Sequence, residues 1–123
     1  MKRALLAVLV VAAMAGCSAR GAPDYFAYTK KPIYVGSFDL AHGADRQNFY
    51  VEDGSIGQLR AQVWINATAG GARVDVVGSS GATVWSTSAS GSQALRVDLG
   101  QWTVTVTPTD GAAGEVEIVV VRA

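Results

Sequence analysis

Apolar and polar residues alternate along most of the chain after residue 32, and turn-forming residues separate the alternating runs. The clearest run places four apolar side chains on one face: Leu59, Ala61, Val63 and Ile65. Successive side chains of a β-strand point to opposite faces, so this alternation predicts a half-buried strand. About eight such runs predict an all-β fold, a single antiparallel β-sandwich of the jelly-roll or immunoglobulin-like kind over residues 33–123.

The later runs also suggest how the strands pair. Gly100-Gln101 fits a two-residue type II′ turn, which would join residues 95–99 and 102–106 into a hairpin with every apolar pair on one face. The last run, 116–120, can pair with 102–106 on the same face. The pattern therefore predicts a three-stranded meander, preceded by a Ser- and Gly-rich loop at 86–93.

The run Ile118–Val121 is apolar on both faces. Two interpretations fit a strand of this kind. Either the strand is central and covered on both sides, or Val119 and Val121 belong to an interaction surface. We expect coverage, and the aromatic residues that precede the domain are a candidate for it.

The N-terminus follows a different pattern. Lys2 and Arg3 precede an apolar run from Ala4 to Ala15, which is shorter than the roughly 20 residues that a membrane-spanning helix needs. A short positive region followed by such a run predicts an export signal. The run ends in Met14-Ala15-Gly16-Cys17, and Cys17 is the only cysteine of the chain.

This ending resembles the lipobox of bacterial lipoproteins, in which an apolar residue and two small residues precede a lipid-bearing cysteine. The resemblance implies cleavage between Gly16 and Cys17, and lipidation of the Cys17 thiol. Two or more acyl chains suffice for stable anchoring to a bilayer. The implied location is the bacterial cell envelope. Ser18, standing where Asp would favour inner-membrane retention, implies the outer membrane.

These features divide the chain into a signal peptide (1–16), a lipidated cysteine with a tether (17–32) and the sandwich (33–123). Three aromatic residues stand in the tether: Tyr25, Phe26 and Tyr28. We expect these rings to pack on the edge of the domain. The alternative is an interfacial belt, with the rings at headgroup depth and Lys30 and Lys31 above anionic lipid.

Three groups of residues in the domain carry a further resemblance. They are Phe49-x-Val51-x-x-Gly54, the strand pair from Val63 to Val76, and Gly100-x-Trp102-x-Val104 with the strand that follows it. In these positions residues 47–121 resemble the pre-peptidase C-terminal type domains of secreted bacterial proteases. The resemblance implies a noncatalytic, jelly-roll-like fold used in secretion or binding.

Composition narrows the function classes. The chain has 10 basic and 10 acidic residues, and removal of residues 1–16 leaves eight basic and ten acidic ones. Nucleic-acid binders usually carry a clustered basic excess, so no nucleic-acid partner is expected. A single cysteine excludes an intramolecular disulfide, so the domain depends on its apolar core for stability.

The residues offer little for catalysis or for metal binding. His42, the only histidine, has Asp45 nearby in sequence and could act with it as a base. The chain contains no Gly-x-Ser-x-Gly motif that would supply a serine nucleophile. Zinc would need clustered His and Cys. Calcium would need Asp39, Asp45 and Asp53 to meet at one end of the sandwich. We expect no enzyme activity, no catalytic residues, no metal and no cofactor.

Aromatic residues give the best functional hint. Trp64 lies on the face of its predicted strand opposite the apolar side chains, whereas the pattern does not fix the orientation of Tyr50 and Trp85. Exposed rings can stack on sugars or anchor a protein partner. The leading hypothesis is a noncatalytic, lipid-anchored envelope protein that acts as a binding or structural module. The alternatives are a cell-wall glycan-binding module using these three rings, and a subunit of an envelope assembly.

Overall fold

A computed structural model describes residues 31–123, which form eight β-strands and one short 3-10 helix. The strands are β1 (Tyr34–Asp39), β2 (Asp45–Val51), β3 (Gln58–Ala69), β4 (Ala72–Val77), β5 (Thr83–Thr87), β6 (Gly91–Arg96), β7 (Gly100–Pro108) and β8 (Ala113–Arg122). The helix, η2 (Leu40–His42), lies between β1 and β2. The predicted signal peptide, Cys17 and all but the end of the predicted tether lie outside the described residues.

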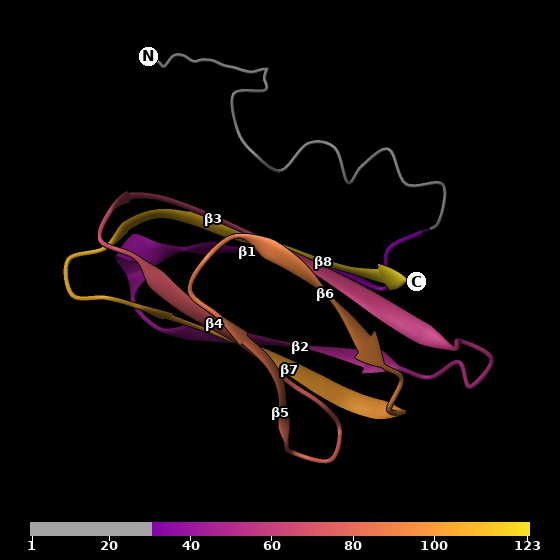
Figure 1. Cartoon of the computed structure of the whole chain (residues 1–123). Helices are drawn as coiled ribbons and strands as arrows, with labels where there is room; N and C mark the ends of the chain where they lie inside the picture. The colour runs from indigo at the N-terminus through magenta and orange to yellow at the C-terminus, as the bar shows by residue number, and fades with distance from the viewer. Residues whose placement is uncertain (1–30) are drawn as a thin grey trace.

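The strands form two four-stranded antiparallel sheets that pack face to face (Figure 1). Sheet A has the order β1-β8-β3-β6, and sheet B has the order β2-β7-β4-β5. The predicted all-β sandwich of eight strands is therefore confirmed. The strand ranges of the clearest runs are close to those expected from alternation.

The predicted meander is wrong. Strand β6 pairs with β3 in sheet A, and β7 pairs with β2 and β4 in sheet B. Strand β8 pairs with β1 and β3, so β7 and β8 lie in different sheets. Among the described strands only β4 and β5 form a hairpin between chain neighbours; each of the other connections crosses from one sheet to the other.

The predicted loop at 86–93 is also shorter than expected. Strand β5 continues to Thr87 and β6 begins at Gly91, which leaves three residues between them. Both strands lie at the edges of their sheets, and most of their side chains are exposed. Small polar residues are therefore suited to these positions. Their Ser and Gly content therefore indicated exposure and not an absence of pairing.

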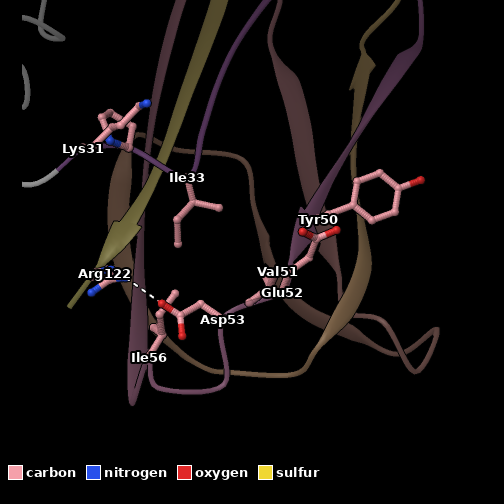
Figure 2. Close-up of a pocket in the computed structure, with 9 residues that line it drawn as sticks. Lys31, Ile33, Tyr50, Val51, Glu52, Asp53, Ile56 and Arg122 are labelled. Atoms are coloured by element: carbon pink, nitrogen blue, oxygen red, sulfur yellow. Dashed lines mark hydrogen bonds and ion pairs between the residues drawn. The ribbon is translucent and has the colours of Figure 1, made fainter.

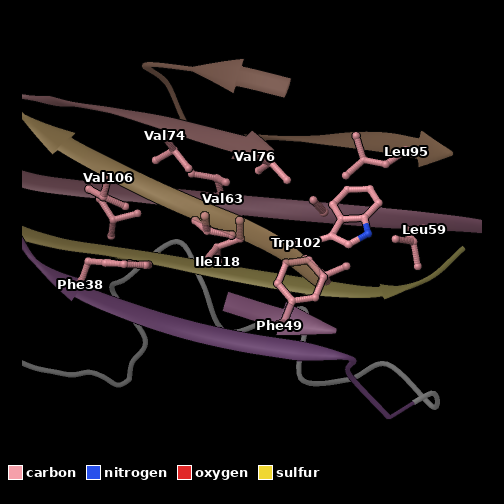
Figure 3. Close-up of a cluster of buried hydrophobic side chains, with 14 of the residues drawn as sticks. Phe38, Phe49, Leu59, Val63, Val74, Val76, Leu95, Trp102, Val106 and Ile118 are labelled. Carbon is pink, nitrogen blue, oxygen red and sulfur yellow. The ribbon is translucent and has the colours of Figure 1, made fainter. Parts of the chain in front are cut away.

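The core fills the space between the two sheets, and Trp102 is its largest fully buried side chain (Figure 3). Its indole Nε1–H donates to the carbonyl oxygen of Asp98 at 2.6 Å, so the buried ring has no unpaired donor. Phe49 stacks on Trp102 with ring centroids 5.8 Å apart. Tyr34 stacks on Phe49 at 4.8 Å, which extends the aromatic packing from sheet B to the edge of sheet A.

Strand β8 is central, as the apolar pattern of its residues suggested. It lies between β1 and β3, and Val116, Ile118 and Val120 face the core. Val119 and Val121 face the opposite side of sheet A, where they are also buried and form a separate cluster with Trp64. The expectation that both faces of this strand are covered is confirmed for these two side chains.

Candidate functional site

An open groove of about 500 Å³ lies at the end of the sandwich where the described chain begins and β8 ends (Figure 2). Lys31 and Pro32 come from the segment before β1, and Arg122 closes β8. Ile33 also precedes β1, and the rest of the lining comes from the end of β2 and the loop that follows it. The lining residues are Lys31, Pro32, Ile33, Tyr50, Val51, Glu52, Asp53, Ile56 and Arg122.

The groove combines an apolar interior with a charged rim. Val51 and Ile56 are buried members of the core, and Ile33 packs against the same core. Lys31 and Arg122 contribute positive charge, whereas Glu52 and Asp53 contribute negative charge. A lining of this composition is suited to binding a mixed apolar and polar group.

Asp53 organises the loop at the mouth of this groove. One carboxylate oxygen accepts from the Ser55 backbone N–H at 2.9 Å and from the Ser55 hydroxyl at 2.7 Å. The other accepts from Arg122 Nη2 at 2.9 Å. The Ser55 bonds, and then the Arg122 charge and hydrogen bond, lower the pKa of Asp53 below its ordinary value. The loop after β2 is thereby tied to the last strand of sheet A.

The three rings predicted to bind a ligand do not share a surface. Tyr50 lies on the outer face of sheet B, opposite Gln101, and is 57% exposed. Trp64 lies on the outer face of sheet A and packs against Val119 and Val121. Trp85 lies on edge strand β5 opposite Val76 and packs against the core. Alternation fixes which face of a strand a side chain lies on, but it leaves open which sheet carries the strand, so the sequence did not show that these three rings lie on different surfaces.

Tyr50 is the most exposed of the three and sits beside the groove. Its hydroxyl donates to Gln101 Oε1 at 3.2 Å. Figure 2 shows the ring pointing away from the pair formed by Asp53 and Arg122. The ring therefore offers a flat, exposed surface on sheet B at the edge of the groove.

The predicted partner of His42 is also different. Its Nε2 lies 3.7 Å from Asp39 Oδ2, not beside Asp45, and both side chains are well exposed. Asp39 accepts from the Ala41 backbone N–H at 3.0 Å and so caps η2. This arrangement orders the turn between β1 and β2.

The aspartates considered for calcium are divided between the two ends of the sandwich. Asp39 ends β1 and Asp45 begins β2, so both flank η2. Asp53 follows the other end of β2, and a strand of seven residues spans roughly 23 Å. In residues 31–123 no group of three or more His, Cys, Asp and Glu side chains is arranged to hold a metal ion.

Sequence reasoning missed the groove. Asp53 was considered only as a calcium ligand, and Arg122 lies 69 residues away in the chain. The pairing of β3 with β8, which sets Leu59 opposite Arg122, together with the crossing from β2 to β3, brings the two together. The available signal was an acidic residue shortly after one strand and a basic residue at the end of another, and such pairs are common on protein surfaces.

No protein-family model matches the chain, and no curated protein matches it significantly in a sequence search. Within residues 31–123 there is no helix with the length and hydrophobicity needed to cross a membrane. The residues of the lipobox-like motif precede the described part of the chain.

Proposed function

We propose that this protein is a lipid-anchored envelope protein whose β-sandwich serves as a noncatalytic binding or structural module. The observation that carries the proposal is the position of the chain's single cysteine. Cys17 directly follows a positive region, a twelve-residue apolar run and two small residues. Sixteen residues separate it from the first strand, which begins at Tyr34.

The arrangement of the sandwich supports this proposal. Lys31, the first described residue, lines the groove together with Arg122. An anchor attached before Lys31 is therefore connected to the end of the sandwich that carries the groove. In the proposed orientation the groove faces the membrane side of the protein, and the turn at η2 lies at the far end.

Metabolic labelling tests the anchor. In a bacterial host supplied with an alkyne fatty acid, the full-length protein should take up the label and fractionate with membranes. The Cys17→Ala variant should take up none and keep its leader, because the thiol that accepts the lipid is absent. A wild-type protein that is unlabelled and soluble would refute the proposal.

Membrane sorting tests the location. In a Gram-negative host the wild-type protein should reach the outer membrane, whereas Ser18→Asp should shift it to the inner membrane. Ser18→Thr is the matched control, because it alters the same position without adding charge. Equal distribution of all three proteins would contradict outer-membrane sorting through Ser18.

Glycan binding through Tyr50 is the second candidate function. The observation that favours it is a ring 57% exposed beside a groove that holds Glu52 and Asp53. Rings stack on sugars while carboxylates accept from sugar hydroxyls. Purified peptidoglycan should retain the wild type and should retain Tyr50→Ala at least several-fold less, with Trp85→Phe as control. No retention of the wild type eliminates this candidate.

A further inference from the structure

The exposed large apolar side chains of residues 31–123 gather at one end of the sandwich. They are Val35, Tyr50, Val84 and Leu99, which are 50%, 57%, 44% and 53% exposed. Val35 and Val84 are the second residues of β1 and β5. Tyr50 is the last but one of β2, and Leu99 directly precedes β7. All four strand ends border the groove end, which we define as segments 31–33, 52–57, 78–82 and 97–99. Single exposed apolar residues are common, but their restriction to one end indicates a contact surface there.

Leu99 and Tyr50 form part of the rim of the groove. The Cδ1 atom of Leu99 lies 3.8 Å from the place that a Cβ on Gly54 would take, so Leu99 stands beside the loop after β2. Tyr50 lines the groove, and its ring points outward on sheet B (Figure 2). The interior adds Ile33 and Ile56, which pack with the core. The groove end therefore presents an exposed apolar rim beside an apolar hollow.

Charged residues are divided unequally between the two ends. The half of the sandwich around η2 carries six acidic and two basic side chains: Asp39, Asp45, Asp75, Asp110, Glu115 and Glu117, with Arg46 and Arg73. The half that includes the groove end carries three acidic and four basic ones: Glu52, Asp53 and Asp98, with Lys31, Arg60, Arg96 and Arg122. A bilayer that contains anionic lipid therefore attracts the second half and repels the first, within about a Debye length of its surface.

Two basic side chains of the groove end are available to an external anion. Lys31 and Arg96 are exposed, and neither makes an ion pair with another residue of the described chain. Two of the three acidic side chains there already accept hydrogen bonds. Asp53 accepts from Ser55 and Arg122, and Asp98 Oδ2 accepts from the Ser80 backbone N–H at 3.3 Å. The positive charge of Lys31 and Arg96 is therefore the part of this end that an anionic partner can use.

The preceding part of the chain joins the sandwich at the same end. The Ile33 backbone N–H donates to the Val120 carbonyl oxygen at 2.8 Å, beside the groove that Lys31 lines. Lys31 lies fourteen positions after Cys17, so a lipid on Cys17 keeps Lys31 within about 50 Å of the bilayer. The end at η2 lies roughly 30 Å further on, the length of the nine-residue strand β7. A short tether of this kind raises the effective concentration of the groove end at the membrane surface.

We propose that the groove end rests on the bilayer to which the protein is anchored, with Leu99 and Tyr50 at the depth of the lipid headgroups. Lys31 and Arg96 then lie beside lipid phosphates, and the acidic half around η2 faces away from the membrane. Buried apolar area and attraction to anionic headgroups together set the strength of interfacial binding. A tyrosine ring, apolar with a polar tip, is suited to this depth. The inference rests on the proposed function for the anchor and adds a preferred orientation of the body on the surface.

Fluorescence quenching by brominated lipid tests this docking. The mature chain, residues 17–123, is coupled through the thiol of Cys17, its only cysteine, to a maleimide phospholipid in vesicles of phosphatidylethanolamine and phosphatidylglycerol. Leu99→Trp places a reporter at the groove end, and Ala89→Trp places one in the exposed loop between β5 and β6 at the other end. Bromine on the acyl chains should quench the emission added by the reporter at least about threefold more at position 99 than at position 89.

Charge reversal tests the two basic side chains. Lys31→Glu combined with Arg96→Glu should lower the quenching at position 99 by at least about twofold, because both charges then face anionic headgroups as repulsive groups. Arg46→Glu is the matched control, since Arg46 is exposed and lies in the half around η2. It should leave the quenching at position 99 unchanged. Tyr50→Trp, at an exposed position of the same end, repeats both measurements if Leu99→Trp fails to fold.

The other outcomes overturn the proposal in distinguishable ways. Equal quenching at positions 99 and 89 would mean that the body has no preferred orientation, and no quenching at either would mean that it does not touch the bilayer. Absent quenching together with a dimer in sedimentation of the Cys17→Ser chain would assign the groove end to a second copy. Chemical coupling replaces the lipid attached in the cell, so the anchor is tested separately. A chain that docks when coupled but takes up no fatty-acid label in cells refutes the anchor alone.

Discussion

Tyr34 connects the edges of the two sheets through one side chain. Its ring stacks on Phe49 of sheet B, and its hydroxyl donates to Gln47 Oε1 of β2 at 2.6 Å. Burial, and then the negative charge of Asp45, raises the pKa of Tyr34 well above its ordinary value. The ring also lies over Gly36, where any Cβ would overlap it. Position 36 therefore requires glycine for lack of space, although its backbone conformation is ordinary.

Substitution of Tyr34 tests this link. Tyr34→Phe keeps the ring and removes one hydrogen bond, so the free energy of unfolding at pH 7 should fall by about 1 kcal/mol. Tyr34→Ala also loses the stacking and should lower it by about 3 kcal/mol. Urea unfolding followed by tryptophan fluorescence measures both changes.

The same residue predicts a response to alkaline pH. Because the folded-state pKa lies above the unfolded value, the contribution of Tyr34 is complete below pH 10.0 and declines as pH rises beyond it. Wild-type stability should therefore fall between about pH 10 and pH 11 by more than that of Tyr34→Phe. Equal losses in both proteins would contradict the assignment of a raised pKa to this hydroxyl.

Gly36 gives a test of close packing with an internal control. Gly36→Ala should destabilise the fold by about 1–3 kcal/mol, because the methyl group displaces the Tyr34 ring. Gly57 has open space around its Cβ position, so Gly57→Ala should change stability by less than about 1 kcal/mol. Thermal unfolding of the two variants measures the difference. Similar melting temperatures would mean that the Tyr34 ring moves away at little cost.

At the scale of elements, alternation predicted the strands well and their pairing poorly. Both sheets of a sandwich face one core, so a strand with apolar residues at every second position fits either sheet equally well. Strands β6 and β7 can bury their apolar side chains in the core either as hairpin partners in one sheet or as members of opposite sheets. In the structure the two strands lie on opposite sheets, and the Asp98 carbonyl accepts from Trp102 Nε1 in the segment that crosses between them. The alternation of apolar and polar residues in the sequence gives no sign of this hydrogen bond.

The candidate site was less predictable than the strands for the same reason. The aromatic candidates Trp64 and Trp85 were identified by position, but their surfaces depend on sheet assignment and on neighbours that pair from far along the chain. The groove depends on Arg122 meeting the loop after β2. The apolar outer positions of β8 were predictable, because Val119 and Val121 break the alternation within their own strand.

The loop after β2 predicts a response to acid. The folded-state pKa of Asp53 is lowered, so its contribution to stability is complete above its ordinary pKa of 3.8 and is lost as pH falls through the lower folded value. Asp53→Asn should therefore be less stable than the wild type at pH 7 and equally stable near pH 2. Denaturant unfolding at the two pH values measures this.

Asp45 supplies the control for that experiment. It is exposed and lies at the start of β2, away from Arg122. Asp45→Asn should give a much smaller difference between the two pH values. If Asp53→Asn shows the same deficit at pH 2 as at pH 7, the lost hydrogen-bond geometry and not the charge explains its effect.

At the scale of the whole molecule, one end of the sandwich gathers the features of interest. The described chain begins there and β8 ends there (Figure 1). The groove is lined by residues from both of these segments. An anchor before residue 31 would hold this end toward a bilayer.

The most direct test of this account is the mass of the N-terminal peptide of the protein extracted from bacterial membranes. The account predicts a peptide that begins at Cys17 and carries diacylglycerol, with or without an added amide-linked acyl chain. A peptide that begins at Met1, or one that begins near residue 17 with an unmodified thiol, would contradict it.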